Sequence, residues 1–367
     1  MENQISLSEV LKYAIENNAS DIHITQDEKS WIRINGNLQP YGDVIPISDI
    51  DELVELLTPN LTEAYKKMRD RRRNYPIDGA FKYMFRRFRI NIYMGMDGVN
   101  MAIRLLGDKI LSFDELYLPK AIERFAEIRS GLFLVVGATG SGKSTTIASI
   151  LDNINHSRNE NILTIEQPIE YIHKSDKSRI EQIEVGLHIN SFAEATVAAM
   201  RQNPNIILVG EMRDLETVQN AITLAETGHV VYGTLHAKSV TETIDRIIDI
   251  FPPKQQDQIR IQLANVLRGI LHQTMIRKSG DGVVPLVELL SVDDVISTMI
   301  MGKQRTNAIR DYMRGKSAFG NVHIIDNAAW HIENNRLELE QVKNILSKDE
   351  YEIVRSIINT QRRESFG

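Results

Sequence analysis

The chain has 367 residues, of which 42% are hydrophobic and 25% are charged, with a formal net charge of −6, so a soluble globular protein with room for two domains is expected. The acidic balance argues against a protein that wraps nucleic acid, and no apolar run approaches the roughly 18 residues needed to span a bilayer. The chain contains no cysteine, which excludes disulfides and cysteine-ligated zinc.

The N-terminal region predicts short helices and a hairpin. Its first residues lack the basic and apolar regions of a signal peptide, so a cytoplasmic location is expected. Ser6 and Glu9 have the spacing of a capping box at the start of an amphipathic helix. Asn35-Gly36, after an extended run, favours a tight hairpin turn, and a second helix is expected from about Ile50 to Leu57.

Alternating apolar residues then predict strands. The alternation between Phe81 and Ile92 changes parity at Arg86-Arg87, which indicates a bulge or a strand break there. A second alternating run ends at Leu105 and leaves Arg104 on its opposite face. Residues 1–112 are therefore predicted to form a small α+β domain with a mainly antiparallel sheet.

From residue 113 onward, apolar strands alternate with helices, which is typical of a parallel α/β domain over residues 113–367. A capping box at Ser191 and Glu194 opens a helix that stops at Asn203-Pro204. Beyond about residue 290 the pattern becomes mostly helical. The predicted strands cover residues 132–136, 161–166, 206–211 and 229–235.

The first of these strands runs into the pattern G-x-x-x-x-G-K-S, a phosphate-binding loop. Its glycines let backbone N–H groups point at phosphate oxygens, while Lys143 reaches the terminal phosphates and the Ser144 hydroxyl can hold Mg²⁺. An apolar stripe from Ile147 to Ile154 predicts the helix that follows. The candidate nucleotide-binding residues are Gly137, Ala138, Thr139, Gly140, Ser141, Gly142, Lys143, Ser144 and Thr145.

Acidic residues follow two other strands. The carboxyl ends of parallel strands collect catalytic groups, so Glu211 is a candidate for the Mg²⁺ shell, acting through water, and Glu166 and Glu170 are further candidates. His229 and His236 bracket the last strand, and His236 could sense the γ-phosphate. A hydrogen-bonded structural histidine is the alternative.

Two sets of basic residues are open to more than one interpretation. Arg87, Arg89 and Arg104 could reach a neighbouring subunit's phosphates as fingers in trans, or could be ordinary surface arginines. A second set is usually a solvated face, and could instead touch an acidic lipid surface or partner. That set comprises Lys66, Lys67, Arg69, Arg71, Arg72 and Arg73.

Several stretches resemble the motifs of the type II/IV secretion ATPases, over nearly the whole chain. They correspond to the Walker A, Asp-box, Walker B and His-box motifs, and to two N-terminal motifs. These stretches are 137–144, 162–170, 209–214, 227–236, 20–23 and 87–91. Within the family, residues 210–217 and 246–252 are most similar to the retraction motors of type IV pili.

The resemblance implies an N-terminal PAS-like α+β domain and a RecA-like P-loop ATPase core with a helical C-terminal region, assembled as a homohexamer with nucleotide between subunits. It implies a cytoplasmic motor that hydrolyses ATP with Mg²⁺ to power pilus retraction. The expected partner is an inner-membrane pilus platform protein, with peripheral rather than integral membrane association and no nucleic acid.

The resemblance also implies roles for individual residues. Glu170 would activate water, and Glu211 would be an atypical Walker B acid. Lys143 and Ser144 would bind phosphate and Mg²⁺. Arginines at positions 87, 89 and 104 would act across the subunit interface, and His229 and His236 would be the His-box pair.

Two positions depart from the family pattern. Gln167 stands where the Asp box usually has Asp, which removes a charge near the Mg²⁺ site. Val295-Ile296-Ser297 aligns with a family Ala-Ile-Arg stretch that is tied to retraction, and it lacks the Arg.

Three alternative functions remain open from the sequence. Extension motors share the nucleotide motifs, but usually carry an added N-terminal domain and a four-cysteine zinc element. A RecA-like DNA translocase would be expected to show a basic groove with stacking aromatics, and only 6% of this chain is aromatic. A regulatory ring that barely hydrolyses ATP is kept open by Gln167.

Overall fold

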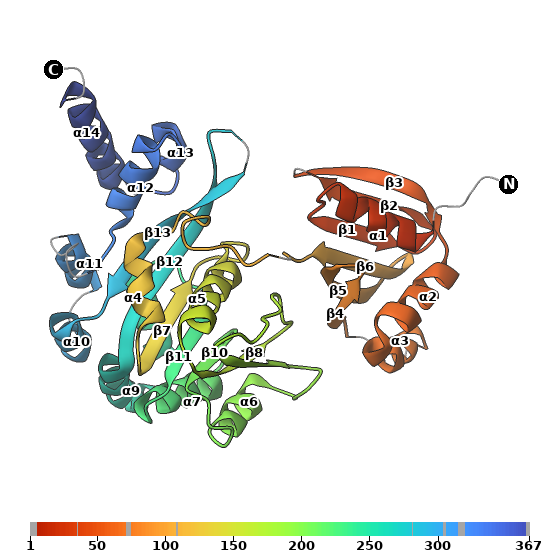
Figure 1. The fold of residues 1–367 in the computed structure, drawn as a ribbon, viewed down its shortest axis with the longest axis horizontal. Coiled ribbons are helices and arrows are strands. Elements are labelled where there is room, and N and C mark those ends of the chain that lie inside the picture. The colour runs from red at the N-terminus through yellow and green to blue at the C-terminus, as the bar shows by residue number, and fades with distance from the viewer. Residues whose placement is uncertain are drawn as a thin grey trace. The chain divides into compact units, whose positions relative to one another are not determined.

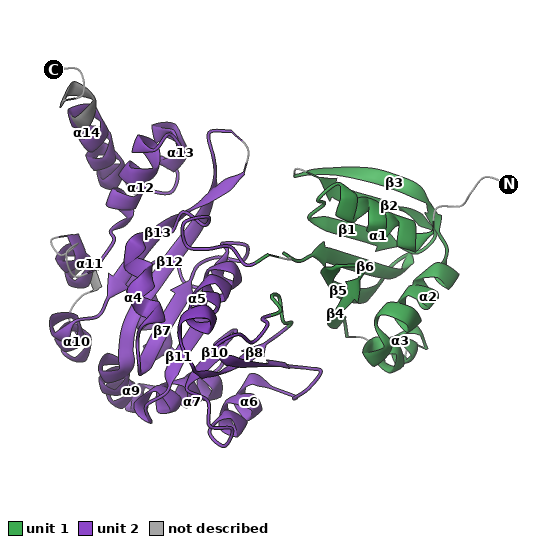
Figure 2. Cartoon of the chain, viewed as in Figure 1, with its two compact units in different colours: residues 1–109, 168–172 green, residues 110–167, 173–367 purple. Residues whose placement is uncertain are grey.

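The computed structural model describes residues 6–34, 36–70, 75–107, 109–280, 282–303, 306–314 and 320–364. The chain divides into two compact units, shown in different colours in Figure 2. Unit 1 comprises residues 1–109 and 168–172, and unit 2 comprises residues 110–167 and 173–367. Each unit has its own sheet and its own hydrophobic core.

Unit 1 is built on a six-stranded sheet in the order β3-β2-β1-β6-β5-β4, and every neighbouring pair is antiparallel. Apolar residues of α1 and α2 are buried in one cluster with residues from the strands. The predicted antiparallel α+β region is confirmed. Its elements are α1 (Leu7–Glu16), β1 (Asp21–Thr25), β2 (Glu28–Ile34), β3 (Asn37–Ile45), α2 (Ile47–Leu57), the 3₁₀ turn η1 (Pro59–Leu61), α3 (Thr62–Arg69), β4 (Ile77–Tyr83), β5 (Arg86–Gly95) and β6 (Gly98–Leu105).

The helix starts of unit 1 agree with the sequence in part. The capping box of α1 is present, with the Ser6 amide donating to Glu9 Oε2 at 3.0 Å. Helix α2 begins at Ile47 rather than Ile50, because its first turn carries Ser48 and Asp49, which an apolar pattern does not register but which suit a helix start.

The sequence predicted one hairpin in this unit, at Asn35-Gly36, and a bulge or a strand break near Arg86-Arg87. Strands β2 and β3 pair from Ile34 opposite Asn37, and Gly36 in the turn has φ 82°, while Asn35 lies outside the described residues. The parity change near residue 86 corresponds to a strand break, which was one of the two predicted alternatives. It is a tight hairpin in which Tyr83 pairs with Arg86 and Met84 has φ 52°.

Unit 2 contains a seven-stranded sheet in the order β13-β12-β7-β11-β10-β8-β9 (Figure 1). All neighbouring pairs are parallel except β12 with β13, so the predicted parallel sheet is confirmed. The strands are β7 (Gly131–Val136), β8 (Asn161–Glu166), β9 (Arg179–Glu184), β10 (Ile206–Val209), β11 (Val230–Leu235), β12 (Leu267–Arg277) and β13 (Val283–Ser291).

Both faces of this sheet are buried. Phe133 and Val135 of β7 pack into a cluster with α4 and α5, whereas Leu132 and Leu134 pack on the other face with α7, α8 and α9. This explains why β7 is apolar at every position rather than at alternate ones. The helices before the C-terminal region are η2 (Lys120–Ile122), α4 (Glu123–Ala126), α5 (Lys143–Ser157), α6 (Phe192–Ala199), α7 (Leu215–Glu226), α8 (Val240–Asp249) and α9 (Pro253–Val266).

Three strands of unit 2 had no counterpart in the sequence prediction: β9, β12 and β13. Helix α9 passes directly into β12, with Leu267 as its C-cap, and no glycine, proline or asparagine separates the two. Without such a break, a sequence pattern gives no sign that the chain has changed from helix to strand. Helix α6 has the predicted Ser191 cap, with the Glu194 amide donating to Ser191 Oγ at 3.1 Å, but it ends at Ala199.

The C-terminal region is helical, as predicted. It comprises α10 (Asp294–Met301), α11 (Thr306–Arg314), α12 (Ile324–Glu333), α13 (Leu339–Val342) and α14 (Lys348–Glu364). Helices α12 and α14 share a core cluster with β12 and β13. Over the described ranges, no helix combines the length and apolar character needed to cross a bilayer.

A buried histidine holds α12 against the sheet. His331 is fully buried, and its Nε2 lies 3.1 Å from the Pro285 carbonyl of β13, to which it donates. Burial is the main cause that lowers the pKa of His331, to about 4; the hydrogen bond to Pro285 opposes this effect and the Arg336 guanidinium adds to it. His331 is therefore neutral in the folded protein near pH 7.

This pKa predicts a stability loss in acid. Between about pH 6.5 and 4 the unfolded chain binds a proton at His331 that the folded chain does not, so the free energy of unfolding falls as pH falls through this window. We expect urea unfolding to show a smaller loss between about pH 7.5 and 5 in His331→Phe than in the unaltered protein.

The control is His156→Gln. The exposed His156 has a raised pKa because its ring bonds the Asp152 carbonyl, so the sign of its contribution is opposite, and removing it should not reduce the acid loss. An unchanged acid loss in His331→Phe would contradict the assignment.

Candidate nucleotide-binding site

The phosphate-binding loop connects β7 to α5 in a tight curl. Gly137, Gly140 and Gly142 have φ of 151°, 76° and 84°, and α5 begins at Lys143. A Cβ at Gly137 would lie 2.4 Å from the Gln273 carbonyl oxygen, so this position requires glycine for space as well as for its backbone conformation. The predicted strand, loop and helix are all present.

The Lys143 ammonium is held in place by backbone carbonyls of the loop. Lys143 Nζ donates to the carbonyls of Gly137 and Ala138 at 3.0 and 2.9 Å. Ser144 and Thr145 are half-buried in the first turn of α5, while Thr139 and Gly140 are exposed. The ammonium thus lies across the loop at the helix N-terminus, where negative charge is favoured.

Gln273 of β12 supports the loop, and the sequence analysis missed it. Thr146 Oγ1 donates to Gln273 Oε1 at 2.9 Å, and Gln273 Nε2 donates to the Ser141 carbonyl. Its side chain is 1% exposed. The strand that carries it was not predicted, and Gln273 lies between His272 and Thr274, so the local sequence carries no signal for it.

Glu211 and His236 come together at the carboxyl ends of β10 and β11. His236 Nε2 lies 3.2 Å from Glu211 Oε1, and Arg213 Nε also donates to that carboxylate. Strand β11 lies between β10 and β7, and Leu235 pairs with Val136, so His236 follows β11 at the same level at which Gly137 follows β7. The predicted loop, acid and histidine therefore share one edge of the sheet.

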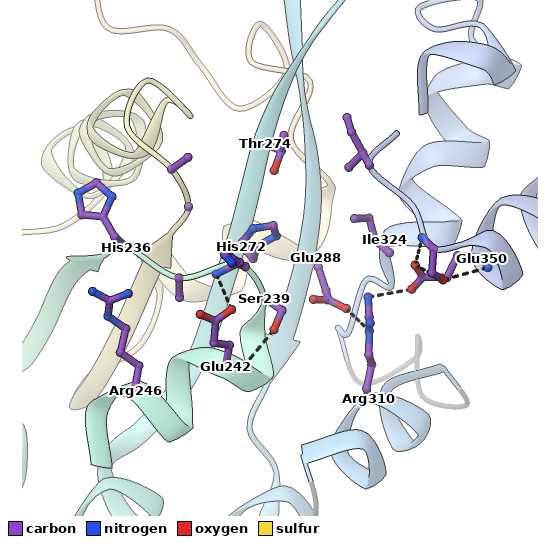
Figure 3. Close-up of a pocket in the computed structure, with 16 residues that line it drawn as sticks. His236, Ser239, Glu242, Arg246, His272, Thr274, Glu288, Arg310, Ile324 and Glu350 are labelled. Carbon is purple, nitrogen blue, oxygen red and sulfur yellow. Dashed lines mark hydrogen bonds and ion pairs between the residues drawn. The ribbon is translucent and has the colours of Figure 1, made fainter. Parts of the chain in front are cut away.

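Two cavities meet at His236. One of about 520 Å³ is lined by Thr139, Glu211 and Arg246, among others. The other, of about 580 Å³, extends from Gly137 and Ala138 toward the C-terminal helices (Figure 3).

An ion-pair network lines the larger cavity. Arg310 lies between two carboxylates, with its Nε 3.2 Å from Glu288 and its Nη2 2.8 Å from Glu350 (Figure 3). Burial raises the pKa of Glu288, and the Arg310 guanidinium opposes this effect. The network connects β13 with α11 and α14 beside the candidate site.

The acidic residues at and after the end of β8, Glu166 and Glu170, differ from each other in their surroundings. Glu166 is buried, and its Oε1 accepts hydrogen bonds from Thr164 Oγ1 at 2.7 Å and from Gln182 Nε2 at 3.3 Å. Gln167 is exposed. Glu170 is half-buried and belongs to the 168–172 segment that groups with unit 1.

His229 is not brought to the phosphate-binding loop. It precedes β11, at the opposite end from His236, and six residues of extended strand separate the two by roughly 20 Å. Its Nδ1 lies 2.9 Å from the Leu224 carbonyl at the end of α7 and 3.1 Å from Thr227 Oγ1. These contacts match the structural alternative for a lone histidine.

The three arginines lie on neighbouring strands of unit 1. Arg89 and Arg104 are cross-strand partners on β5 and β6, and Arg87 is two residues from Arg89, on the same face. Arg104 Nε donates to Asp21 Oδ1 at 2.8 Å, and Arg89 lies 3.9 Å from Asp78.

A cavity of about 360 Å³ includes Arg89 and Arg104 in its lining. Burial alone would raise the pKa of Asp21, but its bonds with Arg104 and Ser20 lower the pKa overall.

The described members of the second basic set are paired with acids of their own unit. Lys66 lies 2.8 Å from Glu55, and Arg69 lies 2.6 Å from Asp51. Lys67 pairs with Glu63 at 2.5 Å. These contacts favour the solvated-face interpretation for α3, while Arg71, Arg72 and Arg73 lie outside the described residues.

In the C-terminal stretch that departs from the family pattern, Ser297 lies on α10, and its Oγ donates to the Ala264 carbonyl of α9 at 2.8 Å. A short hydroxyl thus ties α10 to α9 at this position.

Comparisons with known proteins agree with this architecture. A model of the type II/IV secretion system protein family matches residues 2–360. The type IV pilus retraction ATPase PilT of Pseudomonas aeruginosa is 36% identical over 297 residues, covering 81% of this chain and 85% of the relative. A twitching motility protein of Neisseria gonorrhoeae is 37% identical over 271 residues, covering 73% of this chain and 71% of the relative.

A solved structure has the same fold. The crystal structure of the pilus retraction motor PilT with bound ADP has a TM-score of 0.84 and 36% identity, covering 94% of this chain and 98% of that one. Family model, relatives and fold all point to the same assignment, so the chain belongs to the type II/IV secretion system ATPase family.

Proposed function

We propose that this chain is a motor ATPase that hydrolyses ATP to power the retraction of a type IV pilus. The observation that carries the proposal is the shared sheet edge at which the phosphate-binding loop, Glu211 and His236 meet, in a chain similar to PilT over most of its length. In the proposed architecture, residues 1–112 are a PAS-like domain and residues 113–367 a RecA-like ATPase domain with a helical end. Six chains form a cytoplasmic ring.

Mg²⁺ would supply charge neutralisation at the β- and γ-phosphates. The donor set fits this ion, because Ser144 offers a hydroxyl at the start of α5 and Glu211 offers a carboxylate just after β10, at the same edge of the sheet. Mg²⁺ usually keeps several waters and takes few protein ligands, so the absence of a three-residue cluster of metal-binding side chains among the described residues agrees with it.

The other residues have these proposed roles. Lys143 exchanges its two carbonyl partners for phosphate oxygens, and His236 reports the γ-phosphate to Glu211 through their contact. Glu170 accepts a proton from the attacking water. Arg87, Arg89 and Arg104 stabilise the phosphates of a neighbouring subunit, and the proposed role of His229 lies away from the loop of its own chain.

The proposed partner is an inner-membrane pilus platform protein, reached by peripheral association at the cytoplasmic face, without nucleic acid. A second candidate function is a ring that binds ATP but hydrolyses it weakly. It is favoured by Gln167, an exposed amide in place of a carboxylate.

Loss of the Lys143 ammonium is expected to abolish turnover. Lys143→Ala removes the cation that the loop aims at the phosphates, so ATPase activity of the purified protein should fall by at least about 100-fold, or roughly 3 kcal/mol of transition-state stabilisation. Near-normal activity in the variant would contradict the site, and negligible activity in the unaltered protein would instead favour the regulatory ring.

Pilus retraction is tested in cells. Deleting the gene should leave more pili on the surface and abolish twitching, because assembled pili are no longer withdrawn. A plasmid copy should restore both phenotypes, and the Lys143→Ala copy should restore neither. Cells without pili would instead indicate an extension motor.

Shared sites are tested by mixing subunits. Because the arginines and the phosphate-binding loop lie in different units, a site built across subunits should recover activity when Arg104→Ala and Lys143→Ala chains, each inactive alone, assemble together. Some interfaces would then combine an intact loop with an intact arginine. Lys66→Ala, at an exposed ion pair, is the matched control and should be active alone. Absence of recovery at every mixing ratio would count against fingers in trans.

A further inference from the structure

Gln273 contacts the phosphate-binding loop at both of its ends. Besides the hydrogen bonds to the Ser141 carbonyl and the Thr146 hydroxyl, its backbone oxygen would lie 2.4 Å from a Cβ at Gly137, and its Nε2 would lie 2.9 Å from a Cβ at Gly142. Gln273 therefore leaves no room for a side chain at two glycine positions of the motif, Gly137 and Gly142. The loop and β12 are closely packed against each other at these points.

The bond to Ser141 also orients the next N–H group. In a planar trans peptide the C=O of one residue and the N–H of the next point in opposite directions. Because Gln273 Nε2 holds the Ser141 carbonyl on the β12 side, the Gly142 N–H is turned away from Gln273. Inward N–H groups are what such a loop offers to phosphate.

The second bond fixes the helix. Thr146 lies in the first turn of α5, is 2% exposed, and donates to the same amide group. One buried amide thus supplies the donor that the loop needs and the acceptor that the helix needs, because a neutral carboxamide carries an N–H donor and a carbonyl acceptor side by side. A carboxylate would leave the Ser141 carbonyl unsatisfied, and an apolar side chain would leave both partners unsatisfied.

The geometry points to Gln273 as a positioning residue for nucleotide binding, one that holds the phosphate-binding loop in its binding conformation before the nucleotide arrives. This inference rests on the proposed ATPase function. Its contacts exist without nucleotide, so they lower the ordering cost of binding equally for the substrate and for the transition state. Losing them should therefore raise the dissociation constant and KM more than it lowers kcat.

The test compares nucleotide affinity and turnover in matched variants. With a fluorescent ADP analogue and Mg-ATP as probes, Gln273→Leu should raise Kd and KM by about tenfold or more, because two buried hydrogen bonds are lost, and kcat should change by less than about threefold. Thr146→Val keeps the bond to Ser141, so a smaller rise is expected. That variant also serves if Gln273→Leu does not fold.

Gln273→Glu adds a pH readout that general destabilisation would not produce. An ionised carboxylate still accepts from Thr146 but cannot donate to the Ser141 carbonyl, whereas the protonated acid can. The ratio of its Kd to that of the unaltered protein should therefore fall as pH is lowered from about 9 to 6.

Asn327→Leu is the control, because Asn327 is 2% exposed and its Oδ1 accepts from the Val287 amide of β13 at 2.9 Å, outside the loop. It should leave Kd within about twofold. The inference is overturned if Gln273→Leu also stays within twofold, or if Asn327→Leu raises Kd as much. If the unaltered protein neither binds ADP nor hydrolyses ATP, the proposed function fails instead.

Discussion

A loop that binds phosphate through its backbone must keep its N–H groups pointing inward, against the tendency of a short glycine-rich segment to sample many conformations. In this protein the constraint is met from outside the motif. Strand β12 lies beside β7, and its Gln273 binds both the loop and α5. The curl of residues 137–142 thus depends on a strand more than 120 residues further along the chain.

That support is rigid because the sheet is buried on both faces. Alternate residues of β7 belong to two separate core clusters, so a shift of the strand would disturb both cores. The neighbouring strand β11 places His236 at the level of Gly137, where it contacts Glu211 at the end of β10. The positions of three functional groups therefore follow from strand register, with little freedom left to the loops.

Local patterns were enough to predict the loop, α5, and strands β7, β8, β10 and β11, because each has a continuous apolar run or a motif of its own. Strand β12 could not be predicted, since α9 enters it without a turn residue, and Gln273 was missed with it. The two histidines flanking β11 looked equivalent in the sequence, yet the strand's length and direction separate them. What required the structure was pairing between segments far apart in the chain, which no short window contains.

An arginine of unit 1 is oriented by an ion pair that is weak enough to be exchanged for another partner. Arg104 is 58% exposed and its partner Asp21 is 18% exposed, and ion pairs at a protein surface typically contribute only about 1 kcal/mol. Asp21 therefore orients the guanidinium, and breaking this ion pair so that Arg104 can bind another partner costs little free energy. A phosphate group offers a guanidinium two parallel hydrogen bonds and more charge, which is the stronger interaction once water is excluded. In the proposed ring, Asp21 would hold Arg104 ready and release it to a phosphate, so that the arginine need not be ordered from a disordered state during each cycle.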